Sequence, residues 1–336
     1  MEEILELPRV PIGEWVERLV EDILRDDLGF IFDGIRAFFG FQIEVLEAIF
    51  NFPPPLIFIL IAAAIAYWLR GWGFALYTVV AFGIIDSMGL WTATMDTFAL
   101  IIVAGFYAIL LGIPGGIINA RNRTVSTLVR PILDFMQTLP VFVYIIPAII
   151  LFSIGAVPGM VAALIFSLPP AVRLTELGIR GVDEEVVEAA EAFGSGQNRT
   201  LKRVQMPLAL PAIMQGVNQV IMLALSMVVV AGLIGAGGLG REVVRGVSRV
   251  DLDIGFEAGL AVVFLAIFLD RITSVVGQGG VGGGRARRRA LKLAEMAQAS
   301  RSTSTASDDS TADATEAQTE GTGAEGRIPG QQPGQS

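Results

Sequence analysis

The hydrophobic pattern divides the chain into long apolar stretches separated by short polar intervals. Between residues 53 and 276, seven apolar stretches approach or exceed the roughly 20 residues that a helix needs to cross a bilayer. This pattern predicts an all-α polytopic membrane protein with about seven transmembrane helices. The expected spans are residues 55–70, 73–89, 97–118, 131–153, 157–172, 212–236 and 256–276.

Residues 1–52 have a different pattern and are expected to form a separate N-terminal region. Apolar side chains recur there at helical spacing and charged ones occupy the opposite face, which is typical of amphipathic helices. Such helices would either lie in the membrane interface or pack on the outside of the helix bundle. The apolar stripe consists of Trp15, Val16, Leu19, Val20, Ile23 and Leu24.

Residues 285–336 form a third region, which leaves 53–284 as the expected transmembrane domain. It begins with a basic run at residues 285–289 and continues, from about Gln298, as a polar tail of mostly Ser, Thr, Ala, Gly and acidic residues. This composition cannot bury enough apolar surface to offset the entropy of ordering, so we expect the tail to be disordered.

The polar interval at residues 173–211 has an internal order of its own. Helix formers with regularly spaced apolar positions fill residues 180–193, and glycines at 194 and 196 then interrupt the helix. A second helical piece follows, and we expect Pro207 and Pro211 to end it. Two short helices joined at a glycine predict a compact projection for a partner, although an ordinary amphipathic loop would share these features.

A motif within this interval resembles a known signature. Glu188-Ala189-Ala190, three residues, Gly194, nine residues, Val204 and then Met206-Pro207 resemble the EAA loop of permease subunits of binding-protein-dependent ABC importers, with conservative departures at Val204 and Met206. The resemblance implies a type I importer permease bundle whose EAA loop docks, from the cytoplasm, into a groove of an ATPase subunit. The implied coupling residues are Glu188, Ala189, Ala190, Gly194, Val204, Met206 and Pro207.

Five further stretches, between about residues 90 and 276, resemble the permeases for glycine betaine and proline. They are residues 136–140, 168–175, 219–227, 234–240 and 269–273. This resemblance implies an importer for glycine betaine, proline betaine, choline or a similar compatible solute. It also implies three partners: a separate ABC ATPase subunit, a separate extracellular substrate-binding protein and a second permease copy that completes a homodimer.

Composition narrows the chemistry that the chain can perform. The 336 residues are 53% hydrophobic and 17% charged, without cysteine or histidine, so thiolate chemistry and the commonest metal ligand are excluded. No Gly-rich loop ends in Gly-Lys-Ser/Thr. We therefore expect a non-enzymatic chain that binds no metal, cofactor or nucleic acid, while a partner subunit uses ATP and Mg²⁺.

The net charge of −9 suggests a halophile, although a merely acidic surface would look the same.

Arginine placement tests the orientation, because cytoplasmic loops are enriched in Lys and Arg. If the EAA loop is cytoplasmic, Arg70, residues 121–130 and the basic run at 285–289 are cytoplasmic as well. The multi-pass protein would then have its N-terminus outside the cell and its C-terminus in the cytoplasm. The arginines of residues 241–249 disagree with this topology, so segment 237–250 is expected to be either partly re-entrant or a short external loop.

Polar side chains inside two apolar stretches are candidates for the lining of a translocation pathway. Isolated polar residues in membrane helices usually face the bundle interior, and a neutral path suits a zwitterion because strong binding would slow its release. The candidates are Gln137, Thr138, Pro140, Gln219 and Ser226. The alternative role for them is hydrogen bonding between helices.

Two other functions are rivals for the same sequence. The same permease architecture could carry another small cargo, such as an amino acid or a metal chelate. An ion-driven secondary transporter would need paired acidic residues within its spans and an inverted repeat, and the sequence shows neither.

Overall fold

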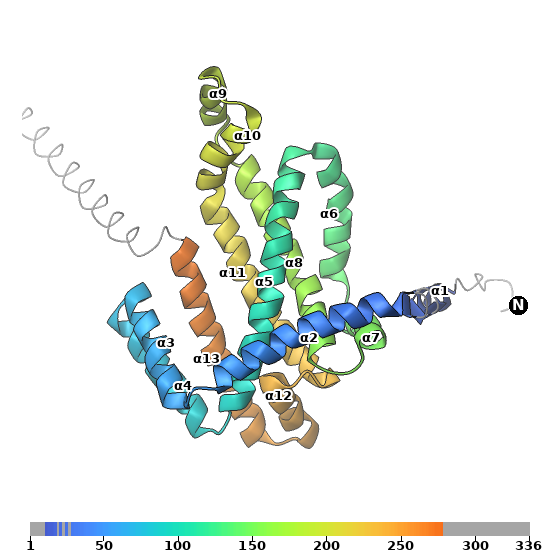
Figure 1. Ribbon diagram of the computed structural model, residues 1–336, viewed down its shortest axis with the longest axis vertical. Helices are drawn as coiled ribbons and strands as arrows, with labels where there is room; N and C mark the ends of the chain where they lie inside the picture. The colour runs from blue at the N-terminus through green and yellow to red at the C-terminus, as the bar shows by residue number, and fades with distance from the viewer. Residues whose placement is uncertain (1–10, 19, 22–23, 26–27, 278–336) are drawn as a thin grey trace, which may run out of the picture. The chain divides into compact units, whose positions relative to one another are not determined.

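The computed structural model describes residues 11–18, 20–21, 24–25 and 28–277. These residues form helices joined by short connections (Figure 1). The elements are α1 Ile12–Arg18, α2 Gly29–Asn51, α3 Pro55–Arg70, α4 Trp72–Ser87, α5 Trp91–Arg121, α6 Arg123–Thr138, α7 Val141–Phe152, α8 Ala156–Arg180, α9 Glu184–Ala192, α10 Gln197–Thr200, the π-helical turn η2 Leu201–Gln205, α11 Met206–Ala231, the 3₁₀ turn η3 Gly232–Ile234, α12 Gly238–Arg249 and α13 Leu252–Gly277. The expectations for residues 285–336, and for Leu19 and Ile23 of the N-terminal stripe, lie outside the described residues.

Four helices are long and apolar enough to cross a membrane, and up to six spans result if each of two bent helix pairs counts as one. The four are α5, α8, α13 and the continuous rod 197–234, which contains α11. They coincide with the expected spans 97–118, 157–172, 212–236 and 256–276. The all-α polytopic fold is thus confirmed. The expected number of seven spans is close to the upper count of six that the described residues give. Helix α4, where 73–89 was expected to span, is apolar but has only 16 residues.

The expected span over residues 131–153 is not one continuous helix. It consists of the end of α6 and of α7, which meet at an angle of 95° and count as one span only if the bent pair is taken together. The break falls at Pro140, whose ring disfavours helical geometry at the preceding residue; Leu139 has an extended backbone with ψ of 134°. The Tyr144 hydroxyl of α7 donates a hydrogen bond across the bend to the carbonyl oxygen of Met136.

Helices α5, α8 and α11 pack side by side in the centre of the described bundle (Figure 1). Small residues allow this close approach. A Cβ atom added at Gly112 of α5 would overlap the Ala171 side chain of α8, and one at Gly178 would lie 2.8 Å from Cβ of Ala212 on α11. Around this centre, the α3–α4 hairpin contacts α13, and α2 packs against α5, α7 and α8.

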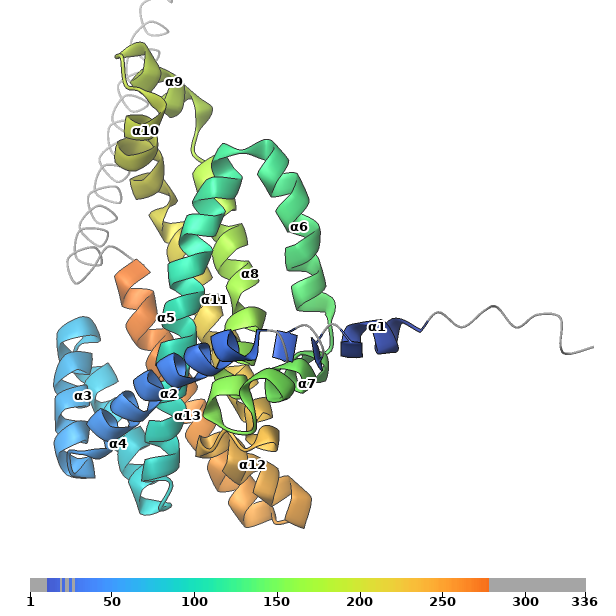
Figure 2. The same ribbon diagram turned by 45° about the vertical axis from the view of Figure 1, so that its right-hand side comes forward.

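Segment 237–250, for which a re-entrant or an external loop was expected, contains the helix α12. It packs against α5, α11 and α13 at the end of the bundle opposite to α9 and α10 (Figures 1 and 2). The tight turn into α12 needs left-handed glycines at positions 235, 237 and 238. Because Gly232 and Gly240 have no side chains, the backbone of the η3 turn lies in direct contact with the backbone of α12.

A buried hydrogen bond holds α12 to α5, and its loss is expected to destabilise the protein. The backbone N–H of Leu239 donates to Oγ1 of Thr97 over 2.8 Å, and both residues are buried. Replacing Thr97 with the isosteric valine leaves that N–H unsatisfied, at a cost of about 1–3 kcal/mol. The thermal unfolding midpoint of the purified chain in detergent measures the effect.

Thr78→Val is the matched control for this substitution. Thr78 is equally buried, but its hydroxyl donates to the carbonyl oxygen of Phe74 in its own helix. That oxygen keeps its helical N–H partner after the change, so only a small shift is expected. Equal midpoints for the two variants would contradict the importance of the Thr97 contact.

Candidate coupling segment and translocation face

The first half of the EAA motif lies on the short helix α9. Asp183 caps its start by accepting a hydrogen bond from the backbone N–H of Glu185 at 3.2 Å. At its end, Gly194 is left-handed with φ of 80°, and the N–H of Ser195 bonds to the carbonyl oxygen of Ala190 at 3.1 Å. This is the glycine-terminated helix end that the sequence predicts, so the break at Gly194 is confirmed.

The second half of the motif lies on a helix that does not end at the prolines. Helix α10 continues through η2 into α11 as one rod, so the expectation that Pro207 and Pro211 terminate it is wrong. Pro207 has no N–H to offer the carbonyl of Arg203, and its ring pushes that carbonyl away. The turn widens instead, because Met206 bonds to the carbonyl of Leu201, five residues back.

The predicted coupling residues form an exposed surface at one end of the bundle (Figure 2). Of these seven, Glu188, Ala189, Gly194 and Pro207 are exposed, and Ala190, Val204 and Met206 are half-buried. Phe193 lies among them with 93% of its surface exposed. Its helical spacing indicated only one apolar position of an amphipathic helix, so sequence reasoning did not identify Phe193 as an exposed side chain.

This coupling segment, residues 181–207, is attached to α5 and α8 by both apolar and polar contacts. A small core of Ile179, Leu201, Ala209 and Ile213 lies beneath it. The guanidinium of Arg180, the last residue of α8, donates to the carbonyl oxygens of Asn119 at 2.6 Å and Ala120 at 3.3 Å. These are carbonyls at the end of α5 that lack helical partners, so the residue that precedes the segment is fixed to α5 as well as being part of α8.

The predicted pathway residues occupy two places. Gln137, Thr138 and Pro140 lie at the bend between α6 and α7, whereas Gln219 and Ser226 are exposed on one face of α11. Where the structure describes the chain, no hydrogen bond joins the two groups. The Thr138 and Ser226 hydroxyls bond only to carbonyls of their own helices, so they do not hold helices of this chain together.

A polar contact between α11 and α13 is made by Asn218, a residue that sequence reasoning missed. Asn218 of α11 donates to Asp270 of α13 at 2.9 Å and accepts from the hydroxyl of Thr273 at 2.8 Å. Asn218 directly precedes Gln219 in the sequence. Asn218 faces α13 and Gln219 is exposed, and only the position of α13 beside α11 distinguishes the two amides.

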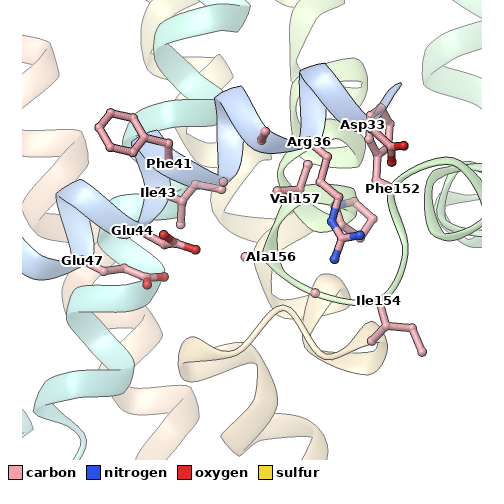
Figure 3. Close-up of a pocket in the computed structure, with 14 residues that line it drawn as sticks. Asp33, Arg36, Phe41, Ile43, Glu44, Glu47, Phe152, Ile154, Ala156 and Val157 are labelled. Carbon is pink, nitrogen blue, oxygen red and sulfur yellow. The ribbon is translucent and has the colours of Figure 1, made fainter. Parts of the chain in front are cut away.

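A separate hollow of about 580 Å³ lies between α2 and the α7–α8 connection (Figure 3). The guanidinium of Arg36 donates to the Ser153 hydroxyl at 3.2 Å, and the carboxylates of Glu44 and Glu47 line the other part. Its charged side chains come from α2 alone. Among the described residues, no three His, Cys, Asp or Glu side chains are grouped to hold a metal ion.

The membrane-spanning helices and the exposed EAA segment define a class: a multi-pass membrane component of a transport system. Residues 108–279 match the family model described as "Binding-protein-dependent transport system inner membrane component". The chain belongs to this family.

Curated relatives match over most of their length. The glycine betaine transport system permease protein OpuAB of Bacillus subtilis is 45% identical over 80% of this chain and 94% of its own. The glycine betaine/carnitine transport permease protein GbuB of Listeria monocytogenes is 42% identical, covering 80% and 95%. The glycine betaine/proline betaine permease protein ProW of Escherichia coli is 40% identical, covering 80% and 76%.

Among solved structures, an inward-facing MetNI methionine ABC transporter aligns at a TM-score of 0.48 and 20% identity. The alignment covers 55% of this chain and 92% of that one.

Family membership confirms the resemblance to ABC importer permeases that the EAA motif carries. It also confirms that the chain is a transport permease component and a multi-pass membrane protein. Systems of this family include an ATPase and a binding protein besides the membrane component, so the chain works with both kinds of partner.

Proposed function

We propose that the chain is the permease subunit of an ATP-driven importer for glycine betaine, proline betaine or choline-type compatible solutes. The observation that carries this proposal is the 45% identity to a glycine betaine permease over 80% of the chain. In this proposal, the seven EAA residues couple closure of a separate ATPase subunit to alternating access. That subunit uses ATP and Mg²⁺, and this chain binds neither.

We further propose that two copies of the chain enclose the pathway. Gln215, Gln219 and Ser226 follow one another at helical spacing on α11 and are exposed. Amide side chains facing lipid would lack hydrogen-bond partners, so a second copy with a water-filled path between the two chains would satisfy them. The proposed pathway residues Gln137, Thr138 and Pro140 would contribute from the α6–α7 bend.

The orientation and boundaries stay part of the proposal. The N-terminus would be outside and the C-terminus cytoplasmic, with the coupling segment on the cytoplasmic side. Residues 1–52 would form an accessory helical region, 53–284 the permease domain and 285–336 a juxtamembrane tail. The acidic composition supports a high-salt habitat.

Uptake of labelled glycine betaine after osmotic upshift tests the function in a host without other betaine systems. With the ATPase and binding protein co-expressed, uptake is expected only when this chain is present, and choline and proline betaine are expected to compete. Unchanged uptake after deletion of the chain would contradict the proposal. Competition by an amino acid or a metal chelate alone would favour the rival cargo.

A further inference from the structure

Helix α6 has an unusual distribution of polarity. Its polar residues Ser126, Arg130 and Asp134, spaced four apart, share the face toward α8. Apolar side chains are exposed on the other side, and only Ser126 and Leu133 of α6 are buried. The exposed set is Leu128, Ile132 and Phe135. Polar contacts are therefore part of the attachment of α6 to α8, together with the buried Leu133.

Glu176 of α8 is the centre of this attachment. Its side chain is only 3% exposed. One carboxylate oxygen, Oε1, accepts hydrogen bonds from Ser126 Oγ at 2.7 Å and Arg130 Nη2 at 2.9 Å, and it forms an ion pair with Arg180 Nη1 at 3.1 Å. A second ion pair, between Asp134 and Arg173, follows along the same two helices. Together they form a polar ladder between α6 and α8.

Packing alone does not explain a buried carboxylate at this position. Removing a carboxylate from water is unfavourable, and an apolar group of similar volume often stabilises a fold equally well. The partners of Glu176 suggest another role, because they connect α6 with the residue that directly precedes the coupling segment. Ser126 and Arg130 belong to α6, while Arg180 holds the end of α5 and directly precedes the coupling segment.

We propose that Glu176 is a positioning residue that makes α6 follow the coupling segment when the ATPase subunits close. The movement would pass from Arg180 through Glu176 to Arg130, and along α6 to the bend that carries Gln137 and Thr138. This inference rests on the proposed importer function. It assigns the transmission between the coupling segment and the pathway to one carboxylate.

Glu176→Gln tests the inference in the complete transporter, reconstituted in proteoliposomes with its ATPase and binding protein. The change keeps the shape and removes the charge. Assembly and ATP hydrolysis are expected to persist, whereas uptake per ATP hydrolysed falls about tenfold. Glu176→Asp, which restores the charge, is expected to recover part of the coupling. Wild-type coupling in Glu176→Gln would overturn the proposal.

Glu242→Gln is the matched control, because Glu242 of α12 also lies beside two arginines, at 3.7 Å from Arg241 and 3.4 Å from Arg245. It contacts neither α6 nor α8, so its coupling ratio is expected to stay at the wild-type value. If Glu176→Gln fails to assemble, Ser126→Ala is the variant that tests the proposal. It removes one hydrogen-bond donor to Glu176 and keeps the ion pairs of Glu176 with Arg130 and Arg180. A smaller loss of coupling supports the role, and an unchanged ratio overturns it.

A distance measurement separates this inference from the choice of substrate. The chain has no native cysteine, so spin labels can be placed at Thr127→Cys on α6 and Val247→Cys on α12, both exposed positions. Trapping the ATPase subunits closed is expected to change this distance in the wild-type background and not with Glu176→Gln. Equal changes in both would overturn the inference, whereas missing betaine uptake by the wild type would overturn only the proposed function.

Discussion

Replacing Gly232 with alanine is expected to leave little or no folded protein. A Cβ atom there would overlap the carbonyl group of Gly240 and lie 2.6 Å from the backbone nitrogen of Arg241. These are backbone atoms, which cannot move aside as a flexible side chain does. Overpacking typically costs about 1–3 kcal/mol and more where a backbone must shift, and a domain is stable by only about 5–15 kcal/mol in total.

The yield of monodisperse protein after purification, followed by the apparent thermal midpoint, measures this effect. Gly259→Ala is the matched control, because Gly259 lies in α13 with no atom within 4 Å of an added Cβ. Alanine in a helix interior is favoured over glycine by about 0.5–1 kcal/mol, so this variant should be at least as stable as the wild type. Normal yield and midpoint for Gly232→Ala would show that the backbones of η3 and α12 can move apart at Gly232 and Gly240 at little cost.

Phe193→Ala is expected to weaken binding of the ATPase subunit strongly. Phe193 is 93% exposed at the end of α9, beside the left-handed Gly194 that reverses the chain. An aromatic side chain held outward on a short rigid helix has the features of an interface hot spot, whose truncation costs about 2 kcal/mol or more. This corresponds to a loss of roughly thirtyfold in affinity.

Titration of the purified ATPase subunit against the permease in nanodiscs measures this affinity. Phe52→Ala provides the same substitution at a position that is 89% exposed and lies in the α2–α3 connection, so its affinity is expected to remain unchanged. Equal affinities for Phe193→Ala and the wild type would place the ATPase contact elsewhere on the chain.

The helices themselves could be predicted from the sequence, but the effect of each proline could not. Pro140 separates α6 from α7, whereas Pro207 lies inside the continuous rod 197–234, in the first turn of α11. Both follow apolar residues and both precede helical segments, so local sequence does not distinguish them. The difference arises because the turn before Pro207 widens to bond Met206 with Leu201, and the chain before Pro140 becomes extended.

The candidate coupling residues could be proposed from the sequence because their motif lies within one stretch, residues 188–207. The contacts that attach this stretch to the bundle could not be predicted. Ser126 and Glu176 are 50 positions apart, and no spacing rule relates them. Similarly, Asn218 and Gln219 are adjacent amides, and their opposite environments depend on where α13 packs. Sequence periodicity shows which residues share a helical face but not which neighbouring helix that face meets.

Helix α2 runs across α5, α7 and α8 and contacts all three. If α5, α7 and α8 change their spacing, α2 cannot keep all of its contacts with them. It must then tilt or detach from at least one of the three helices. A fluorescent dye on an exposed position of α2, for example at Ile49, should therefore report the transport cycle in real time. Such a sensor would follow the transporter's conformational changes without a label in the translocation pathway.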